Sequence, residues 1–276
     1  MIRRPAGARR AAGNAGADAA VGPCTPMGIT FKVLTATMVA ALVYLLVPTA
    51  ARSGISGDGA RVLEAFLQVV GGIYSVLTAF VIFVVWEQFN ALQKLTVREG
   101  CLVSEVPRLA ARLGGEDPES RRRIAWATRA YLDAAVAEWE QLAALRESRA
   151  AVKALDTLDA RAAEGAAAGG PPPAMHGQLV DAIAALRECR VSRVSAAKHR
   201  MPATLSHLLS LLSLLLLVAV LVMPAGESPW VALTAFASLA AVLTMVRAVV
   251  WDMDHPFVGV WRVGVEPFTE AREGIG

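Results

Sequence analysis

Residues 252–257 read "DMDHPF" directly after a long apolar run, and they include residue types that could bind a metal ion. Asp252 and Asp254 offer carboxylates, and His255 offers an imidazole. Calcium takes about six to eight oxygen ligands, so two aspartates cannot hold it alone. The alternative is structural: the acids end a membrane helix in water, and Pro256 turns the chain. We favour the structural interpretation, expect no metal here, and predict that Asp254 holds the turn between the last span and the C-terminal tail.

Other residues that could bind a metal or take part in catalysis do not form a recognisable site in the sequence. Cys24, Cys101 and Cys189 are scattered, without a C-x-x-C pair or a histidine at metal-ligand spacing. The chain has no nucleophile elbow, phosphate-binding loop, dinucleotide fingerprint or H-E-x-x-H motif. We therefore expect no cofactor and no enzyme activity.

The elements that must position these residues are membrane helices. Of the 276 residues, 55% are hydrophobic and only 18% charged, and the mean hydropathy is +0.47. A helix needs about 20 apolar residues to cross the hydrocarbon core of a bilayer. Four runs meet or approach this length, at residues 33–50, 66–86, 204–223 and 230–251. The first is the weakest and could be a signal-peptide core ending near "PTA", but we favour a retained span.

The distribution of Lys and Arg predicts the orientation of the spans. The long 87–203 segment holds 17 of these residues, whereas the short 224–229 connection holds none. Basic segments stay in the cytoplasm. We therefore place both termini and residues 87–203 in the cytoplasm of a multi-pass protein of the bacterial inner membrane. The net charge of only +3 argues against a nucleic-acid partner, and the expected partners are the lipid bilayer and further copies of the chain.

Both ends of the chain lie outside the predicted membrane domain of residues 30–270. Residues 1–29 are rich in Ala, Gly and Arg, and such a segment buries too little apolar surface to fold, so we predict a disordered basic arm. Met27 is a candidate true start, because "MGITFKVL" leads straight into the first apolar run. Residues 271–276 are taken as a short C-terminal tail.

The 87–203 segment predicts a helical bundle inserted between the second and third spans. The second apolar helix continues past Glu87 until Pro107, which should break it. A helix is then expected over 118–160, with Asp117 and Pro118 as its start signal. The flexible break "EGAAAGGPPPAMHG" at 164–177 precedes another helix at 178–200. The predicted fold class is thus all-α, with four transmembrane helices and a helical cytoplasmic domain.

The second span carries small, weakly polar and aromatic residues at helical spacing. Such a face either lets another helix approach or lines a water path, and helix packing is favoured from the pattern alone. The candidates for lining a pore are Gly71, Tyr74, Ser75, Thr78, Phe80, Ile82 and Phe83.

Two charges mark the cytoplasmic ends of spans. Glu87 ends the second span, and Arg247 lies one turn inside the fourth. Arg247 either snorkels to lipid headgroups, pairs with Glu87 or Asp254, or attracts anions to a vestibule.

Several segments together resemble the bestrophin-like family of bacterial membrane proteins. They are "GGIYSVLTAFVIFVVWEQF" at 71–89, "MP" at 201–202 and "WDMDHPFVGVWRVGVEPF" at 251–268. The most specific part is a signature turn made of Asp252, Asp254, Pro256, Phe257, Gly259, Glu266, Pro267 and Phe268. The resemblance implies four spans, a helical cytoplasmic domain and an oligomeric anion channel, pentameric in true bestrophins, whose second helix lines the pore for ions such as chloride.

The chain departs from calcium-binding bestrophins, which carry a dense acidic run after their Pro-Phe. Here "VGVWRVG" follows Phe257, so a calcium role is not carried over. The competing functional hypothesis is a non-conducting membrane scaffold or sensor, whose cytoplasmic helices bind a protein partner. An enzyme acting within the membrane ranks third.

Overall fold

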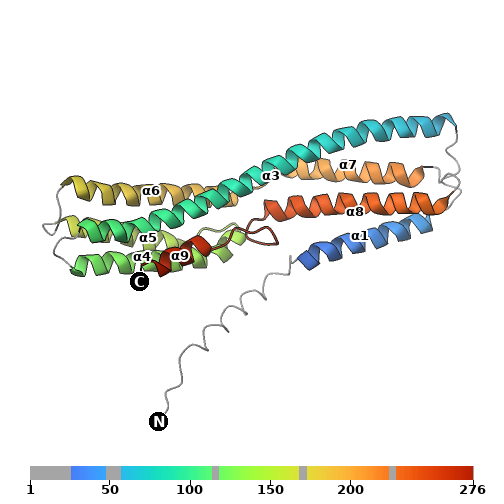
Figure 1. Cartoon of the computed structure of the whole chain (residues 1–276). Helices are drawn as coiled ribbons and strands as arrows, with labels where there is room; N and C mark the ends of the chain where they lie inside the picture. Colours follow the sequence, from blue (N-terminus) through green and yellow to red (C-terminus); the bar gives the residue numbers. More distant parts are fainter. Residues whose placement is uncertain (1–25, 48–56, 114–117, 168–172, 224–227, 276) are drawn as a thin grey trace, which may run out of the picture. The chain divides into compact units, whose positions relative to one another are not determined.

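The computed structural model describes residues 26–47, 57–113, 118–167, 173–223 and 228–275. Every regular element in these ranges is an α-helix (Figure 1), which confirms the all-α fold class. The helices are α1 (Pro26–Leu46), α3 (Asp58–Leu113), α4 (Pro118–Ala143), α5 (Arg149–Ala167), α6 (Pro173–Lys198), α7 (Ala203–Val222), α8 (Pro229–Asp254) and α9 (Glu266–Glu273).

In the part of the chain that the structure describes, four helices are long and apolar enough to cross a membrane, as predicted. The candidate spans are Gly28–Leu46, a part of Asp58–Arg112, a part of Gly177–Val222, and Pro229–Asp254. The first helix begins seven residues before the predicted start at residue 33. Its first four residues, 26–29, were assigned to the disordered arm but are helical, while residues 1–25 of that arm lie outside the described chain.

Helix α3 continues without interruption from its apolar part through Pro107 to Leu113. The predicted break at Pro107 is therefore wrong. A proline inside a helix removes one backbone hydrogen bond and strains the preceding turn. Val103, Val106 and Ala110 on either side of it are buried in a hydrophobic core, and this packing holds the helix together. With 56 residues and a rise of about 1.5 Å per residue, α3 is about 84 Å long.

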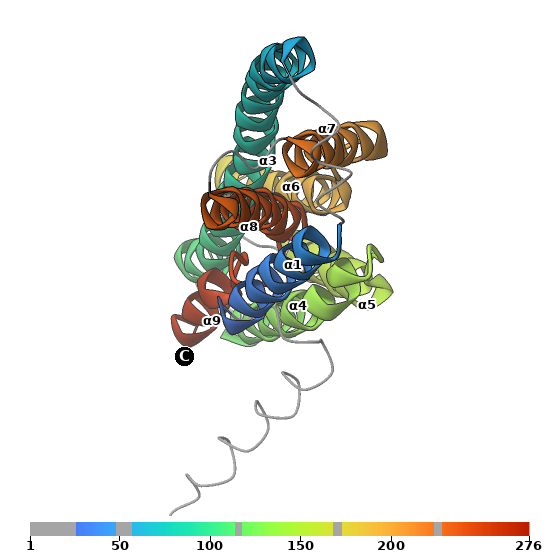
Figure 2. The same ribbon diagram turned by 90° about the vertical axis from the view of Figure 1, so that its right-hand side faces the viewer.

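The chain divides into two compact units, of which the first contains most of the apolar helices. In this unit α8 lies between α1 and α7, and Figure 2 shows the helices in end view. The rings of Tyr44 on α1 and Phe236 on α8 are 5.8 Å apart. The Lys32 ammonium lies 5.0 Å from the centre of the Trp251 ring, at the other end of the same pair of helices.

The second unit is a helical bundle built from the rest of α3 with α4, α5, α6 and α9. Its main core joins buried side chains of all five helices, among them Val103, Tyr131, Leu158, Ile183 and Phe268. The insert between the second and third spans is therefore helical, as the sequence predicts.

The expected helix over 118–160 is two helices, α4 and α5, separated at residues 144–148. Leu145 adopts a left-handed backbone conformation with φ of 58°, which a continuing helix cannot contain. The Ser148 backbone N–H donates to the Glu138 carboxylate at 3.0 Å, and the Ser148 hydroxyl accepts from the Ala151 N–H at 3.4 Å. Ser148 thus caps the start of α5, a tertiary arrangement that helical periodicity does not reveal.

The predicted break at 164–177 is wrong for its two ends, and residues 168–172 lie outside the described chain. Helix α5 continues to Ala167 and α6 begins at Pro173, so much of this stretch is helical. Helix α9, which contains the Glu-Pro-Phe of the signature turn, was not predicted because eight residues are too few for a periodic pattern.

Candidate functional site

The seven pore-lining candidates on α3 lie on different sides of the helix. Tyr74 and Thr78 are each only 8% exposed and face the protein interior, in line with Val70, Val81 and Val85. Ser75, Phe80 and Phe83 are exposed, while Gly71 and Ile82 are half-buried at the border between the two faces. Successive residues turn by about 100° around a helix, which separates Tyr74 from Phe83 by about half a turn.

One side of the exposed surface of α3 is apolar along the membrane part of the helix. It carries Val62, Val69, Ile73, Val76, Phe80 and Phe83, with exposed fractions between 54% and 72%. Such a face contacts lipid, another subunit or a pore axis. The pore-lining role of all seven candidates stays a prediction.

The two interface charges differ in their surroundings. The guanidinium of Arg247 on α8 donates to the Ser210 hydroxyl of α7. This hydrogen bond between two apolar helices gives Arg247 a polar partner within its own unit. Glu87 is exposed on α3, four residues after Phe83.

Within the signature turn, the Asp252 carboxylate organises the chain that follows it. Asp252 is 1% exposed and accepts the backbone N–H groups of Val260, at 3.1 Å, and Trp261, at 2.8 Å. Gly259 lies beside it with φ of +130°, a conformation that only glycine adopts easily. A Cβ atom on Gly259 would lie 1.8 Å from the Asp252 Oδ1, so no side chain fits there.

Asp254 contacts a different segment, the connection between α6 and α7. Its carboxylate accepts the Met201 N–H at 2.7 Å, and its backbone carbonyl accepts from the Arg200 guanidinium at 2.6 Å. Burial lowers the pKa of Arg200. The predicted hold of Asp254 on the C-terminal turn remains untested, but Asp252 is the residue whose carboxylate binds the N–H groups of that turn.

The remaining signature residues enter the bundle. Phe268 is fully buried, with its ring 5.3 Å from that of Trp139 on α4, and Phe257 packs edge-on to Trp139 at 5.8 Å. Pro267 lies so close to α3 that a Cβ atom on Gly100 would come within 2.8 Å of the Pro267 carbonyl oxygen. Pro256 is buried. Glu266 is exposed in the first turn of α9, where the positive end of the helix dipole stabilises its negative charge.

A buried charge network at the centre of the bundle was missed by the sequence analysis. Arg193 of α6, with no exposed side chain, binds Glu99 of α3 at 2.5 Å and Glu138 of α4 at 3.0 Å. Arg190 binds Glu138 at 2.6 Å and Glu147 at 3.2 Å. The Arg193 guanidinium also lies 5.0 Å from the Trp139 ring centre, which ties the network to the signature residues.

The positions of these charges contain a signal that could have revealed them. Glu99 falls in the series of buried residues on α3 spaced three and four apart, at positions 85, 89, 92, 96, 99, 103, 106 and 110. Arg190 and Arg193 occupy the corresponding series on α6, at 179, 183, 186, 190, 193 and 197. Charged residues at core positions of several helices, with opposite signs, predict buried pairs.

The surroundings of three groups in the network shift their pKa values. Burial alone would lower the pKa of Arg193, but the Glu99 carboxylate raises the pKa above its usual value. Burial, followed by the neighbouring Glu99, raises the pKa of Tyr131, whose hydroxyl donates to Glu99 at 2.5 Å. Burial would raise the pKa of Glu147, but the hydrogen bond from Arg190 and the charge of Lys198 lower it overall. Tyr131 therefore stays neutral while Arg193 stays charged.

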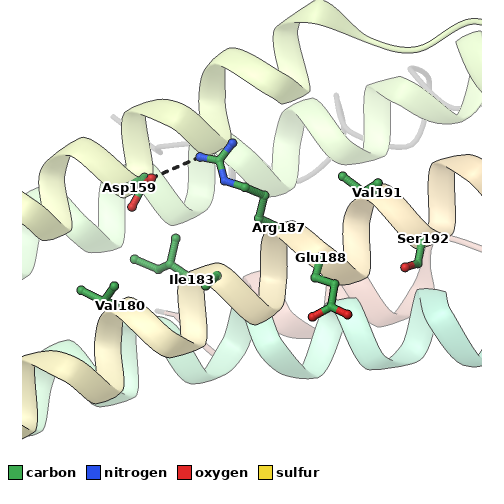
Figure 3. A pocket seen from close by; sticks show the side chains of 8 residues that line it. Asp159, Val180, Ile183, Arg187, Glu188, Val191 and Ser192 are labelled. Carbon is green, nitrogen blue, oxygen red and sulfur yellow. Dashed lines mark hydrogen bonds and ion pairs between the residues drawn. The ribbon is translucent and has the colours of Figure 1, made fainter.

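An open hollow of about 440 Å³ lies between α5 and α6 (Figure 3). Arg187 reaches across from α6 and binds Asp156 at 2.9 Å and Asp159 at 3.2 Å, and these contacts raise the pKa of Arg187. Its charge is thus compensated. Within the described residues, no three His, Cys, Asp or Glu side chains lie close enough together to hold a metal ion.

Four candidate spans and a helical bundle inserted after the second span define a polytopic all-α membrane protein. The sequence profile of the Bestrophin-like domain family matches residues 33–268, and the chain therefore belongs to this family. All eight residues of the signature turn lie within the matched region.

Solved structures share the fold. A bacterial bestrophin homologue from Klebsiella pneumoniae superposes with a TM-score of 0.74 over 90% of this chain and 97% of that chain, at 11% sequence identity. A single-substitution variant of the homologue from the same organism gives a TM-score of 0.73, with 90% and 98% covered and 11% identity. No curated protein matches the sequence.

Proposed function

We propose that the chain is a subunit of a homo-oligomeric channel for small anions in the bacterial inner membrane, and not an enzyme. Both termini and the helical bundle lie in the cytoplasm. The exposed face of α3 in each subunit turns toward a common axis. Membership of the Bestrophin-like family and the fold shared with a bacterial bestrophin homologue support this function.

The continuity of α3 carries the proposal. One helix of 56 residues runs from the apolar span into the bundle, and its exposed face continues without interruption. The apolar part of this face, from Val62 to Phe83, is about as long as the hydrocarbon core of a bilayer is thick, and the same face continues beyond it with charged residues. Copies arranged around an axis would give a pore with an apolar constriction at Val76, Phe80 and Phe83. Ions would pass such a constriction only when water fills it.

The test is conductance of the purified oligomer in planar bilayers. We expect anion-selective current, and we expect Phe80→Ala to raise the conductance severalfold by widening the apolar part. Leu211→Ala is the matched control. Leu211 is 54% exposed on α7, and the substitution removes an apolar side chain from the exposed surface of another apolar helix. Absence of current over a wide voltage range, with the oligomer intact by light scattering, would refute the channel.

A scaffold or sensor is the second candidate, and one surface favours it. Trp126 of α4 is 64% exposed in a hollow of about 590 Å³ that is also lined by Arg122, Arg123 and Arg161. Trp and Arg are enriched at the centres of protein interfaces. A monomeric or dimeric protein without current, whose photo-crosslinking from position 126 captures one defined partner, would favour this function over the channel.

A further inference from the structure

We propose that Lys94 and Arg98 select the charge of the permeating ion, as a positive segment of the α3 face directly after its apolar part. This inference rests on the proposed channel and names the residues that would give it a preference for anions.

The register places both residues on the exposed face of α3. Phe83, Glu87, Lys94, Arg98 and Cys101 follow one another at spacings of three, four or seven residues, which keeps them on one side of a helix. All five are exposed. Their neighbours Leu92, Thr96 and Glu99 face the opposite way and are at most 1% exposed.

Lys94 and Arg98 are uncompensated within the described part of the chain. Neither forms an ion pair or a side-chain hydrogen bond with a described residue, whereas Arg187, Arg190 and Arg193 each bind two carboxylates. Carboxylates of the bundle thus neutralise these three arginines, whereas the charges of Lys94 and Arg98 are open to solvent.

Charges on the rest of this face do not cancel them. From Glu87 to the end of α3, the exposed face carries four basic residues and two acidic ones, namely Lys94, Arg98, Arg108, Arg112, Glu87 and Glu105. An open hollow of about 340 Å³ beside Cys101 is lined by three of these charges, Glu105, Arg108 and Arg112. An ion that moves along this face from the cytoplasm meets a net positive surface before it reaches Phe83.

Coulomb's law gives the size of the change in ion concentration near these charges. One unit charge about 10 Å from a monovalent ion in water changes the local concentration of that ion by about twofold. The change has opposite sign for anions and cations, and charges from several copies multiply it. Two charges on each subunit therefore suffice for a preference of tenfold or more around a shared axis.

The experiment measures reversal potentials of the full-length oligomer in a KCl gradient. We expect the double variant Lys94→Glu with Arg98→Glu to lower the ratio of chloride to potassium permeability by about tenfold or more, following the estimate above. Lys153→Glu is the control, because Lys153 is exposed on α5, away from the α3 face, and should leave the ratio unchanged. The wild-type preference should also weaken in 1 M salt, where the Debye length is about 3 Å.

Modification of Cys101 tests the same face without relying on the assembly of the double variant. Cys101 is exposed and lies three residues after Arg98. A negatively charged methanethiosulfonate should lower the chloride preference of the wild-type channel and a positively charged one should raise it, while Cys101→Ser should not respond. If the channel conducts but its ratio of chloride to potassium permeability changes neither in the double Glu variant nor after Cys101 modification, this inference is wrong while the channel stands. An intact wild-type oligomer without current overturns the channel itself.

Discussion

At the scale of single residues, the bundle buries three charged side chains completely. Glu99, Glu138 and Arg193 have no exposed side-chain surface, and each has lost its hydration on folding. Desolvation of an ion costs several kcal/mol, and an opposite charge offsets it only while both partners are present. The network is therefore sensitive to the loss of any single member.

We expect Arg193→Met to destabilise the bundle by about 3–5 kcal/mol, because two buried carboxylates lose their shared partner. Arg187→Met is the matched control, since Arg187 is 42% exposed with half-exposed partners and such pairs contribute about 0–1 kcal/mol. Unfolding of the detergent-solubilised protein, followed by circular dichroism, measures both. Adding Glu99→Gln to Arg193→Met should recover part of the loss, and equal stability of the two single variants would contradict this account.

At the scale of elements, α9 fastens the end of the chain onto α3 and α4. The Arg129 guanidinium donates to the Ile275 carbonyl at 2.7 Å, and Trp139 donates to the Val263 carbonyl at 2.9 Å. Pro267 packs against α3 at Gly100, where only a residue without a side chain allows the backbones to approach so closely. The Glu-Pro-Phe of the signature turn thus docks the C-terminal segment onto the bundle.

Gly100→Ala should destabilise the bundle by about 1–3 kcal/mol, the usual cost of overpacking. The new Cβ would lie 2.8 Å from the Pro267 carbonyl oxygen and 2.9 Å from its Cβ, and backbone atoms cannot move away cheaply. Gly177→Ala on α6 provides the comparison, because a Cβ there meets no atom within 4 Å. That substitution should stabilise the helix by about 0.5–1 kcal/mol. Thermal unfolding would disprove the tight contact if both variants behaved alike.

At the scale of the whole molecule, the charges around the spans predict how the chain crosses the membrane. The 224–229 connection has no Lys or Arg, while residues 87–203 have 17, so the bundle should stay in the cytoplasm. Ser228 precedes α8 and Cys101 lies in the bundle part of α3, so they should lie on opposite sides of the bilayer.

A membrane-impermeant maleimide tests this topology. In intact spheroplasts, Ser228→Cys in a Cys101→Ser background should be labelled, because the connection is predicted to face outward. The native Cys101 should react only after the membrane is permeabilised. Labelling in the reverse order would invert the proposed orientation while leaving the fold unchanged.

The sequence alone predicted the four spans and the helical insert, and the structure confirms both. Apolar length and helical period are local properties, and each is readable from neighbouring residues. The tertiary structure decided what depends on contacts between distant segments. It divided the α3 candidates into buried Tyr74 and exposed Phe80, kept α3 helical through Pro107, and ended α4 before Leu145. It also paired Arg193 with Glu99, 94 residues apart, because burial forces opposite charges to meet only once the helices have packed.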